Sequence, residues 1–392
     1  MVSTFNENAE ASISTEDENE FGQKKLRELE ELARAESRHS TLFLFLINGY
    51  AAFSVFFLHL ISLETIFSAL LSVSLTIVTY YKTEDKSGWD GSTMEWILLS
   101  FAIVTPMSAS LGMAFTRRES ALRYIAIIRS TLVELYGAHA VWDWSICGKE
   151  NSGRIGSILN WCEHSDNVLN EIFGIGEDLE RFLTLPNAGR ARHRMTRLGR
   201  NEACDLLKVS QGLADSLMLR IGRLTLYTEV LKHEGLPPNE ATRVRQWERD
   251  VTMNCDLLRI IKTYRTPQAL RSLCRIFSVF LPPFYAPYYA SMAQDTNSLG
   301  LGIAFSILTS VALTALFESL SQMEDPFVGH LTLDGIDCCN ELRVIYRKQL
   351  LNMRALYFQN APSFEQHISK VCRTQRTSGR EFGRPRLFDE GH

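Results

Sequence analysis

Long apolar runs alternate with charged, helix-like segments along the chain. The apolar residues are concentrated in three ranges, and almost all charges lie outside them: 41–81, 96–116 and 276–317. About 20 apolar residues are enough to cross the ~30 Å hydrocarbon core of a bilayer, so each range predicts membrane-spanning helix. Elsewhere, over 119–265 and again over 335–371, apolar residues recur every three or four positions, as is typical of amphipathic helices that pack into a bundle. Glycine and proline predict breaks between these helices at 148–156, 186–189 and 235–238.

The first apolar range is long enough for two spans. Residues 42–61 form the strongest candidate, and a shorter run at 66–81 follows a break at 62–64. The shorter run is either an additional span or a helix inserted only in part. Three spans before Arg117 would place the N-terminus outside the cell and two would place it inside, so its side stays open.

The last apolar range predicts a membrane hairpin. Its first arm, 272–292, carries Pro282, Pro283 and Pro287, which break or kink a helix. Its second arm, 300–316, is rich in Ala, Ser, Thr and Gly, which permit close helix packing. After it, Pro326 disfavours helical backbone at the preceding residue, so we expect the last helix to stop there.

The pattern therefore predicts an all-α integral membrane protein, because β signals are nearly absent. Basic residues flank both ends of the middle region, which places that region in the cytosol. The expected parts are a charged N-terminal segment, cytosolic or disordered (1–40), a first membrane part (41–118) with a third membrane helix at about 94–118, a cytosolic helical domain (119–265), a membrane hairpin (266–320), and a cytosolic C-terminal helix with a disordered tail (321–392).

Composition narrows the function classes. The net charge of -4 is spread without a dense basic domain, so we expect no nucleic-acid partner. The eight cysteines form no C-x-x-C pair and are expected to be free thiols. Nucleotide-binding, metalloprotease and serine-hydrolase motifs are absent. His139 and Asp143, four residues apart, could be a ligand pair, but an ordinary helix-surface contact is favoured. Glu163 and His164 with Asp166 are interpreted in the same way, so no catalytic site, metal site or cofactor is predicted.

The third membrane helix has two unusual features. Small residues stand where a lipid-facing helix would carry Leu: Ser108, Ala109, Ser110, Gly112 and Ala114. Larger apolar residues recur four positions apart on one face, and basic residues follow: Met107, Leu111 and Phe115, then Arg117, Arg118 and Arg123. On spacing alone, the apolar face is more often an ordinary packing surface than a pore lining.

Three motifs, in this order, resemble the bestrophin family of anion channels. The first is LGMAFTRRESALRY (111–124), in which a Phe is followed eight residues later by Arg and then by an aromatic residue. The second is the span with Pro282 and Pro283, preceded by a Thr-Pro turn. The third is ESLSQMEDPF (318–327), whose acidic-Pro-Phe signature is Glu324, Asp325, Pro326 and Phe327. The bacterial, algal and plant members are more similar than the calcium-activated animal ones.

The resemblance implies a homopentamer in a lipid bilayer that conducts chloride or other monovalent anions passively through one central pore. By position, Met107, Leu111 and Phe115 match the three apolar residues of the family's pore neck, and the arginines after them would attract anions. In animal members, a run of acidic residues after the Pro-Phe motif contributes to a calcium clasp. Residues 328–331 carry no such run, so we expect calcium activation to be weak or absent.

Other functions stay open. A non-conducting, membrane-anchored helical scaffold would recruit cytosolic partners through the basic stretch 190–200 and the basic tail. In a channel, the same stretch would be a positive vestibule or only a solvated surface. An anion-coupled transporter is less favoured, because no inverted repeat and no unpaired acid or His within a span is visible. The plasma membrane is favoured over an organelle membrane.

Overall fold

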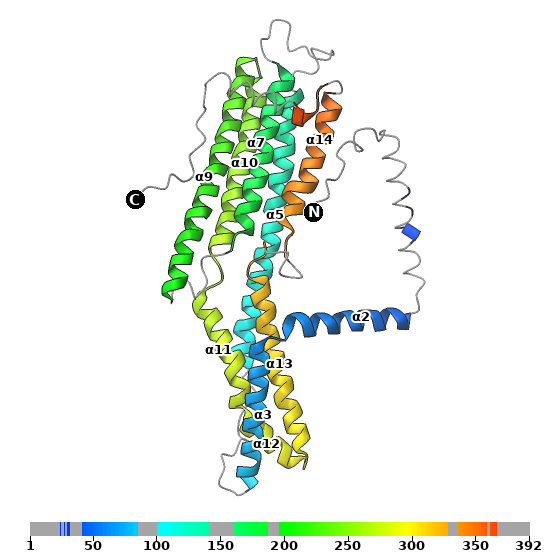
Figure 1. The fold of residues 1–392 in the computed structure, drawn as a ribbon, viewed down its shortest axis with the longest axis vertical. Coiled ribbons are helices and arrows are strands. Elements are labelled where there is room, and N and C mark those ends of the chain that lie inside the picture. The colour runs from blue at the N-terminus through cyan, green and yellow to red at the C-terminus, as the bar shows by residue number, and fades with distance from the viewer. Residues whose placement is uncertain are drawn as a thin grey trace, which may run out of the picture. The chain divides into compact units, whose positions relative to one another are not determined.

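The computed structural model describes residues 24, 27, 30–31, 41–84, 100–141, 160–186, 196–327, 335–358 and 361–366. Every regular element among them is helical (Figure 1), so the all-α prediction is confirmed. The chain divides into two compact units, Met1–Ser62 and Leu63–His392.

Apart from four charged residues (24, 27, 30 and 31), the described part of the first unit is one apolar helical segment. Helix α2 (Thr41–Val55) continues into a turn of π-helix, η1 (Phe56–Leu60). Phe43–Leu60 is long and apolar enough to cross a membrane, and none of it is buried. A helix that is apolar on every side requires apolar surroundings, so this segment fits the span predicted at 42–61.

Helix α3 (Leu63–Glu84) opens the second unit and is longer than the run predicted at 66–81. Its 22 residues extend about 33 Å, and it packs against α11, α12 and α13. The packed face consists of small hydroxyl residues, which let the helix backbones approach closely: Thr65, Ser68, Ser72 and Thr76. The Ser68 hydroxyl donates a hydrogen bond to the Val279 carbonyl at 2.8 Å. This helix is therefore long enough to span and is an integral part of a membrane bundle.

The predicted C-terminal hairpin consists of α11 (Gln268–Phe284), α12 (Ala286–Asp295) and α13 (Leu299–Met323). The prolines were expected to break or kink the first arm. The structure shows a break, because α11 ends and α12 begins on either side of Tyr285. Helices α12 and α13 approach each other closely at Gly302, where a Cβ atom would lie 2.7 Å from the Tyr289 carbonyl oxygen. Helix α13 runs past the expected end at 316 and stops before Asp325, as Pro326 predicts.

Helix α5 (Thr105–Val141) joins the membrane bundle to a second, helical bundle (Figure 1). It follows a turn of π-helix, η2 (Ser100–Val104), and its 37 residues extend about 55 Å. The boundary expected at residue 118 falls inside this helix, where the backbone continues without a break. Residues 94–99 of the predicted third membrane helix lie outside the described residues.

The helical bundle contains the upper part of α5, together with α7 (Trp161–Thr184), α9 (Arg197–His233), α10 (Pro238–Thr263), η3 (Asn340–Val344) and α14 (Ile345–Tyr357). The break predicted at 235–238 is confirmed, with Gly235 at a φ of 97°. The C-terminal helix, predicted over 335–371, ends at Tyr357.

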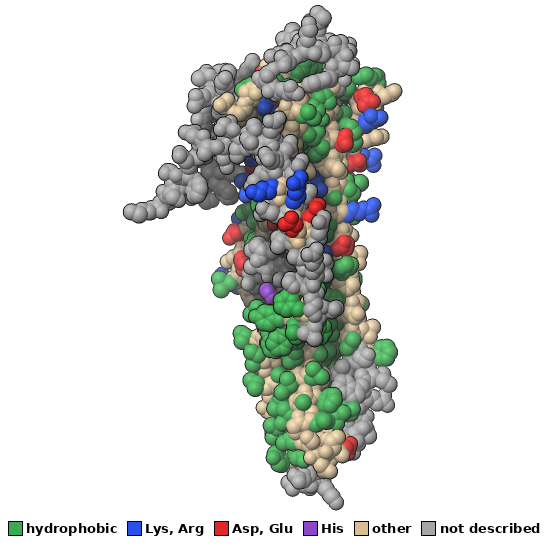
Figure 2. Space-filling view, turned by 90° about the vertical axis from the view of Figure 1, so that its right-hand side faces the viewer, with side chains coloured by type: hydrophobic (Ala, Val, Ile, Leu, Met, Phe, Trp, Pro, Cys, Tyr) green, Lys and Arg blue, Asp and Glu red, His purple; other side chains and the backbone are tan. Residues whose placement is uncertain are grey.

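Charge is distributed unevenly over the surface. On the face shown in Figure 2, Lys, Arg, Asp and Glu gather toward the upper end, and the lower end is mainly hydrophobic or uncharged. This distribution fits a protein with one end in lipid and the other in water.

Candidate functional site

The three residues predicted for a pore neck differ in exposure. Met107 is 1% exposed and packs in the core of the membrane bundle with residues of α11–α13. Leu111 is partly buried against the same core, and Phe115 is 52% exposed. Because an α-helix turns 100° per residue, positions four apart drift by 40° at each step. Of these three residues, only Phe115 faces an open surface of the chain.

A different set of residues, on η2 and α5, forms a continuous exposed face. We call it the open stripe: Phe101, Thr105, Ser108, Gly112, Phe115 and Glu119. Its members alternate three and four positions apart, so they stand above one another along the helix. At Gly112 an added Cβ atom would meet nothing within 4 Å. The spacing of Met107, Leu111 and Phe115 did not reveal this stripe, although the small residues noted in the sequence belong to it in part.

The three arginines after Phe115 point to different surroundings. The Arg117 guanidinium donates a hydrogen bond to the Ile261 carbonyl at 2.5 Å, on α10. Arg118 forms an ion pair with its neighbour Glu119 at 2.7 Å. Arg123 is exposed. Within one protomer they therefore do not form a single basic cluster, and Arg123 is the most open of the three to solvent ions.

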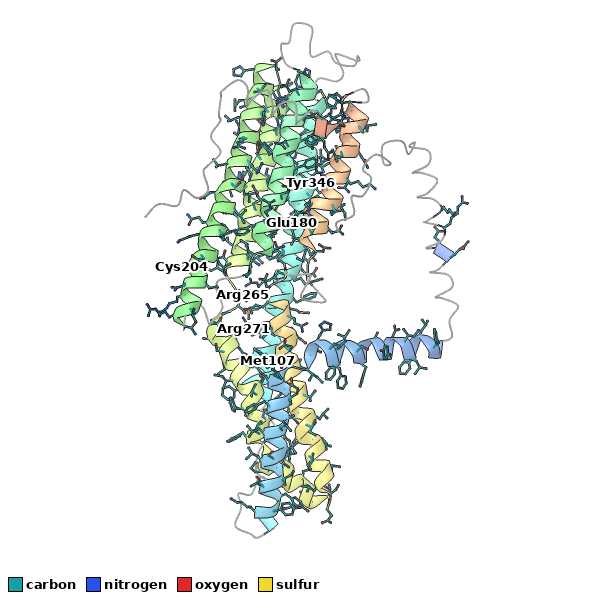
Figure 3. All side chains as sticks on the ribbon, in the orientation of Figure 1. Met107, Glu180, Cys204, Arg265, Arg271 and Tyr346 are labelled. Atoms are coloured by element: carbon teal, nitrogen blue, oxygen red, sulfur yellow. The ribbon has the colours of Figure 1, made fainter. Side chains whose placement is uncertain are left out.

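The acidic-Pro-Phe signature lies at the end of α13, where the two bundles meet, and its carboxylates are surrounded by cations. Asp325 pairs with Lys262 at 2.9 Å and with Arg265 at 3.1 Å. Glu324 pairs with Arg265 at 3.4 Å and also contacts Arg271. Figure 3 shows Arg265 and Arg271 close together at this level, with Met107 nearby in the membrane bundle. The signature therefore ties the end of α13 to the chain that joins α10 to α11.

The remaining residues of the signature extend this connection. The Pro326 carbonyl accepts a hydrogen bond from the Ile336 amide at 2.6 Å. Phe327 is 1% exposed, and the Lys262 ammonium lies 5.7 Å from its ring centroid. Burial lowers the pKa of Lys262, and the nearby Asp325 carboxylate opposes that shift.

Glu324 and Asp325, the two acidic residues of the signature, are not arranged to bind a cation. Both carboxylates already contact Lys or Arg side chains, so little negative charge is left for a metal ion. Within the part of the chain that the structure describes, no group of three or more His, Cys, Asp or Glu residues could hold a metal.

The prediction that His139, His164 and Asp166 are surface residues is wrong. His139 and Asp166 are fully buried, and His139 Nδ1 lies 3.1 Å from His164 Nε2. Burial lowers the pKa of His139 to about 3 and that of His164 to about 4. Asp166 accepts two hydrogen bonds from Arg354, at 2.6 and 2.8 Å. Helix α14 supplies that arginine from 188 positions away, so no local pattern could reveal the pairing.

The basic stretch 190–200 is only partly visible. Arg197 and Arg200 are exposed in the first turn of α9, which Thr196 caps by accepting a hydrogen bond from the Gly199 amide. The other members lie outside the described residues: Arg190, Arg192, His193 and Arg194.

Comparison with known proteins identifies the fold. No family model and no curated protein matches the sequence. Solved structures do match. A crystal structure of a bacterial bestrophin homolog from Klebsiella pneumoniae, a single-substitution variant, has a TM-score of 0.54 at 13% identity and covers 74% of this chain and 98% of its own. A second variant gives 0.53 at 15% identity, covering 74% and 99%. Another crystal structure, described only as that of a membrane protein, gives 0.54 at 14% identity, covering 75% and 99%.

Three described helices are long and apolar enough to cross a membrane, and the matching structures are those of membrane proteins. The chain is thus an integral membrane protein of the all-α class. Its fold is bestrophin-like, as the three sequence motifs predicted.

Proposed function

We propose that this protein is a passive anion channel, assembled from several copies around a shared axis, with five copies as in the family it resembles. The observation that carries the proposal is the open stripe of α5. It presents Thr105, Ser108 and Gly112 on the surface of a membrane bundle, where a helix that faced lipid would carry larger apolar side chains. A water-filled passage lined by these small residues accounts for their exposure.

Phe115 supplies the apolar ring in this proposal. A ring of Phe side chains returns little of the hydration energy that an ion loses on entering, so weakly hydrated anions pass more easily. Of the predicted neck residues, Met107 and Leu111 would have to leave the core of the bundle to reach the axis. We therefore assign only Phe115 to the apolar ring. Repeated in each copy, the exposed Arg123 would raise the local concentration of anions.

Recording from purified protein in planar bilayers tests conduction. Under a salt gradient, we expect a reversal potential close to that of chloride, and we expect Phe115→Ala to reduce discrimination among chloride, nitrate and bicarbonate. Phe280→Ala is the matched control, because Phe280 is similarly exposed (54%) but lies on α11 outside the stripe. Cation-selective currents, or no current from protein shown to be assembled, would contradict the channel.

A membrane-anchored scaffold is the second candidate, and one observation favours it. Large apolar side chains are exposed on the helical bundle along α9, where a partner protein could bind: Leu198, Leu219 and Leu226, at 85%, 54% and 66%. A scaffold would require no contact between the open stripes of different copies.

Cross-linking separates the two candidates. Gly112→Cys places a thiol in the open stripe, and oxidation should join neighbouring copies if the stripes surround one axis. Leu308→Cys is the control, since Leu308 is 64% exposed on α13, away from the stripe. Cross-linking at position 112 above that of the control favours the channel, and equal, low cross-linking at both positions favours the scaffold.

A further inference from the structure

The first three turns of α9 extend past the helix beside them. Helices α9 and α10 meet at the turn around Gly235 and pack antiparallel to each other. From this turn, α10 runs toward the membrane bundle, where the chain continues into α11. Helix α9 has 37 residues and α10 has 26, so the start of α9 reaches about 16 Å beyond the end of α10. We call residues 197–208 the α9 extension.

The burial of α9 also changes along its length. The upper part contributes a buried residue at nearly every turn, Leu217 and Ile221 among them. In contrast, Gly199 is the only buried residue of 197–212, and Leu198 and Leu207 are 85% and 56% exposed. An isolated helix of about three turns is only marginally stable in water. The α9 extension is therefore expected to contact something outside the protomer.

The α9 extension ends near the surface of the membrane. An ion pair of Arg275 with Glu64, whose side chains are 62% and 36% exposed, marks the upper end of the membrane bundle. Exposed charges are unfavourable in hydrocarbon, so this pair lies among lipid headgroups or in water. Figure 1 shows the start of α9 at the level where α11 begins. Arg275 is the eighth residue of α11, so the vertical separation is about 10 Å, and headgroups occupy about 5–8 Å of it.

Three cations share one side of the α9 extension. We call Arg197, Arg200 and Lys208 the basic face. At 100° per residue, they lie within an arc of about 80°. All three are exposed, and none has an ion pair with any residue that the structure describes. The two acidic residues of the extension, Glu202 and Asp205, lie outside this arc, so positive charge is separated from negative charge around the helix.

We propose that the basic face binds the anionic headgroups of membrane lipids. Lipid phosphate groups accept charge-assisted hydrogen bonds from Arg and Lys, and each such side chain near an anionic surface raises the affinity about fivefold. Leu198 and Leu207, beside the cations, suit the boundary between headgroups and acyl chains. The contact would hold the helical bundle against the membrane surface. It does not depend on conduction.

Fluorescence quenching of the full-length protein in vesicles tests this contact. A fluorescent amino acid replaces Leu198, and the quencher is a lipid with a nitroxide on its headgroup. The control position is Leu226, which is 66% exposed on the same helix and about 42 Å further from the membrane. In vesicles of phosphatidylcholine with phosphatidylglycerol, we expect quenching at position 198 well above that at position 226. The difference should decrease without phosphatidylglycerol and at high salt.

A triple variant, Arg197→Gln with Arg200→Gln and Lys208→Gln, removes the basic face. Quenching at position 198 should then fall to the level at position 226. Lys232→Gln is the charge control, because Lys232 is exposed at the other end of α9 and pairs with Glu229 at 2.9 Å; it should leave the quenching unchanged. All four positions are exposed, so both variants are expected to fold.

Three results would overturn the lipid contact. The first is equal quenching at the two positions in both kinds of vesicle. The second is quenching at position 198 that needs no phosphatidylglycerol or survives the triple variant. The third is shielding of position 198 from aqueous iodide that depends on the assembly of copies and not on lipid, which would identify a neighbouring copy as the occupant. Bilayer currents are recorded separately, so the lipid contact and the channel can fail independently.

Discussion

The helical bundle and the membrane bundle share α5 but accommodate buried polar groups in different ways. The helical bundle buries a charged pair, Asp166 with Arg354, and a neutral pair, His139 with His164. The membrane bundle buries hydroxyl groups instead, several of which bond to carbonyls on their own helix, as Thr314 does to Ser310 at 2.7 Å and Thr76 to Ser72 at 2.8 Å. A hydroxyl satisfied in this way carries no charge into lipid.

The two halves of helix α5 also differ in their surroundings. Above Ala121, α5 contributes large apolar residues to the core of the helical bundle. Below Phe115, it is buried on one side and presents the open stripe on the other. The upper half is therefore buried in a bundle core, and the lower half leaves one of its surfaces uncovered.

The largest effect is expected from breaking the charged pair of the helical bundle. Arg354→Met would leave the Asp166 carboxylate buried without its cation, at a cost of about 3–5 kcal/mol. Arg347→Met, on the same helix, is the control, because its partner Glu177 is 3.9 Å away and both side chains are partly exposed; it should cost less than about 1 kcal/mol. Thermal and denaturant unfolding measure the stability loss of each variant. Equal losses in the two variants would contradict the expected difference between the buried pair and the exposed pair.

In the membrane bundle, the largest loss should come from Met107. Met107→Ala empties a buried position and should destabilise the fold by about 2–5 kcal/mol. Unfolding in detergent measures this loss. A loss below about 0.5 kcal/mol would show that Met107 leaves the core in the assembled protein, which would restore it to the pore neck.

The histidine pair makes the helical bundle sensitive to acid. Both histidines have a pKa lowered by burial, to about 3 and about 4, whereas in the unfolded chain they titrate near 6.5. Below pH 6.5 the unfolded state therefore binds protons that the folded state does not, and stability falls with decreasing pH by up to about 2.7 kcal/mol per unit. Above about pH 8 the pair contributes almost no slope.

Unfolding measured between pH 7 and pH 4 tests the histidine pair. His164→Gln removes one of the two titrating groups, so the slope attributed to the pair should be about halved. An unchanged slope in that variant would assign the acid sensitivity to other groups.

The smallest effect on stability is expected at Phe115. Because its side chain is half-exposed in the protomer, Phe115→Ala should change the stability of the separated protomer by less than about 0.5 kcal/mol. Its effect on ion selectivity should nevertheless be clear. A large stability loss together with unchanged selectivity would identify Phe115 as a packing residue.

Local chemistry was enough to predict much of the fold. The apolar ranges, the break at Gly235, the helix stop before Asp325 and the bestrophin-like motifs were all visible in the sequence, because each depends on residues that are neighbours in the chain. The length of α3 was underestimated, since its polar face of Thr65, Ser68, Ser72 and Thr76 becomes favourable only against other helices.

The sequence by itself determined which segments are helical and which can enter a membrane, since hydrophobicity and backbone propensity are properties of short stretches. Only the tertiary structure decided which face of α5 is covered, turning Met107 inward and leaving Gly112 open. It also decided the partners of the buried charges: Arg265 reaches Glu324 from 59 positions away, and Arg354 reaches Asp166 from 188. Such contacts depend on how helices pack, which no single stretch of sequence specifies.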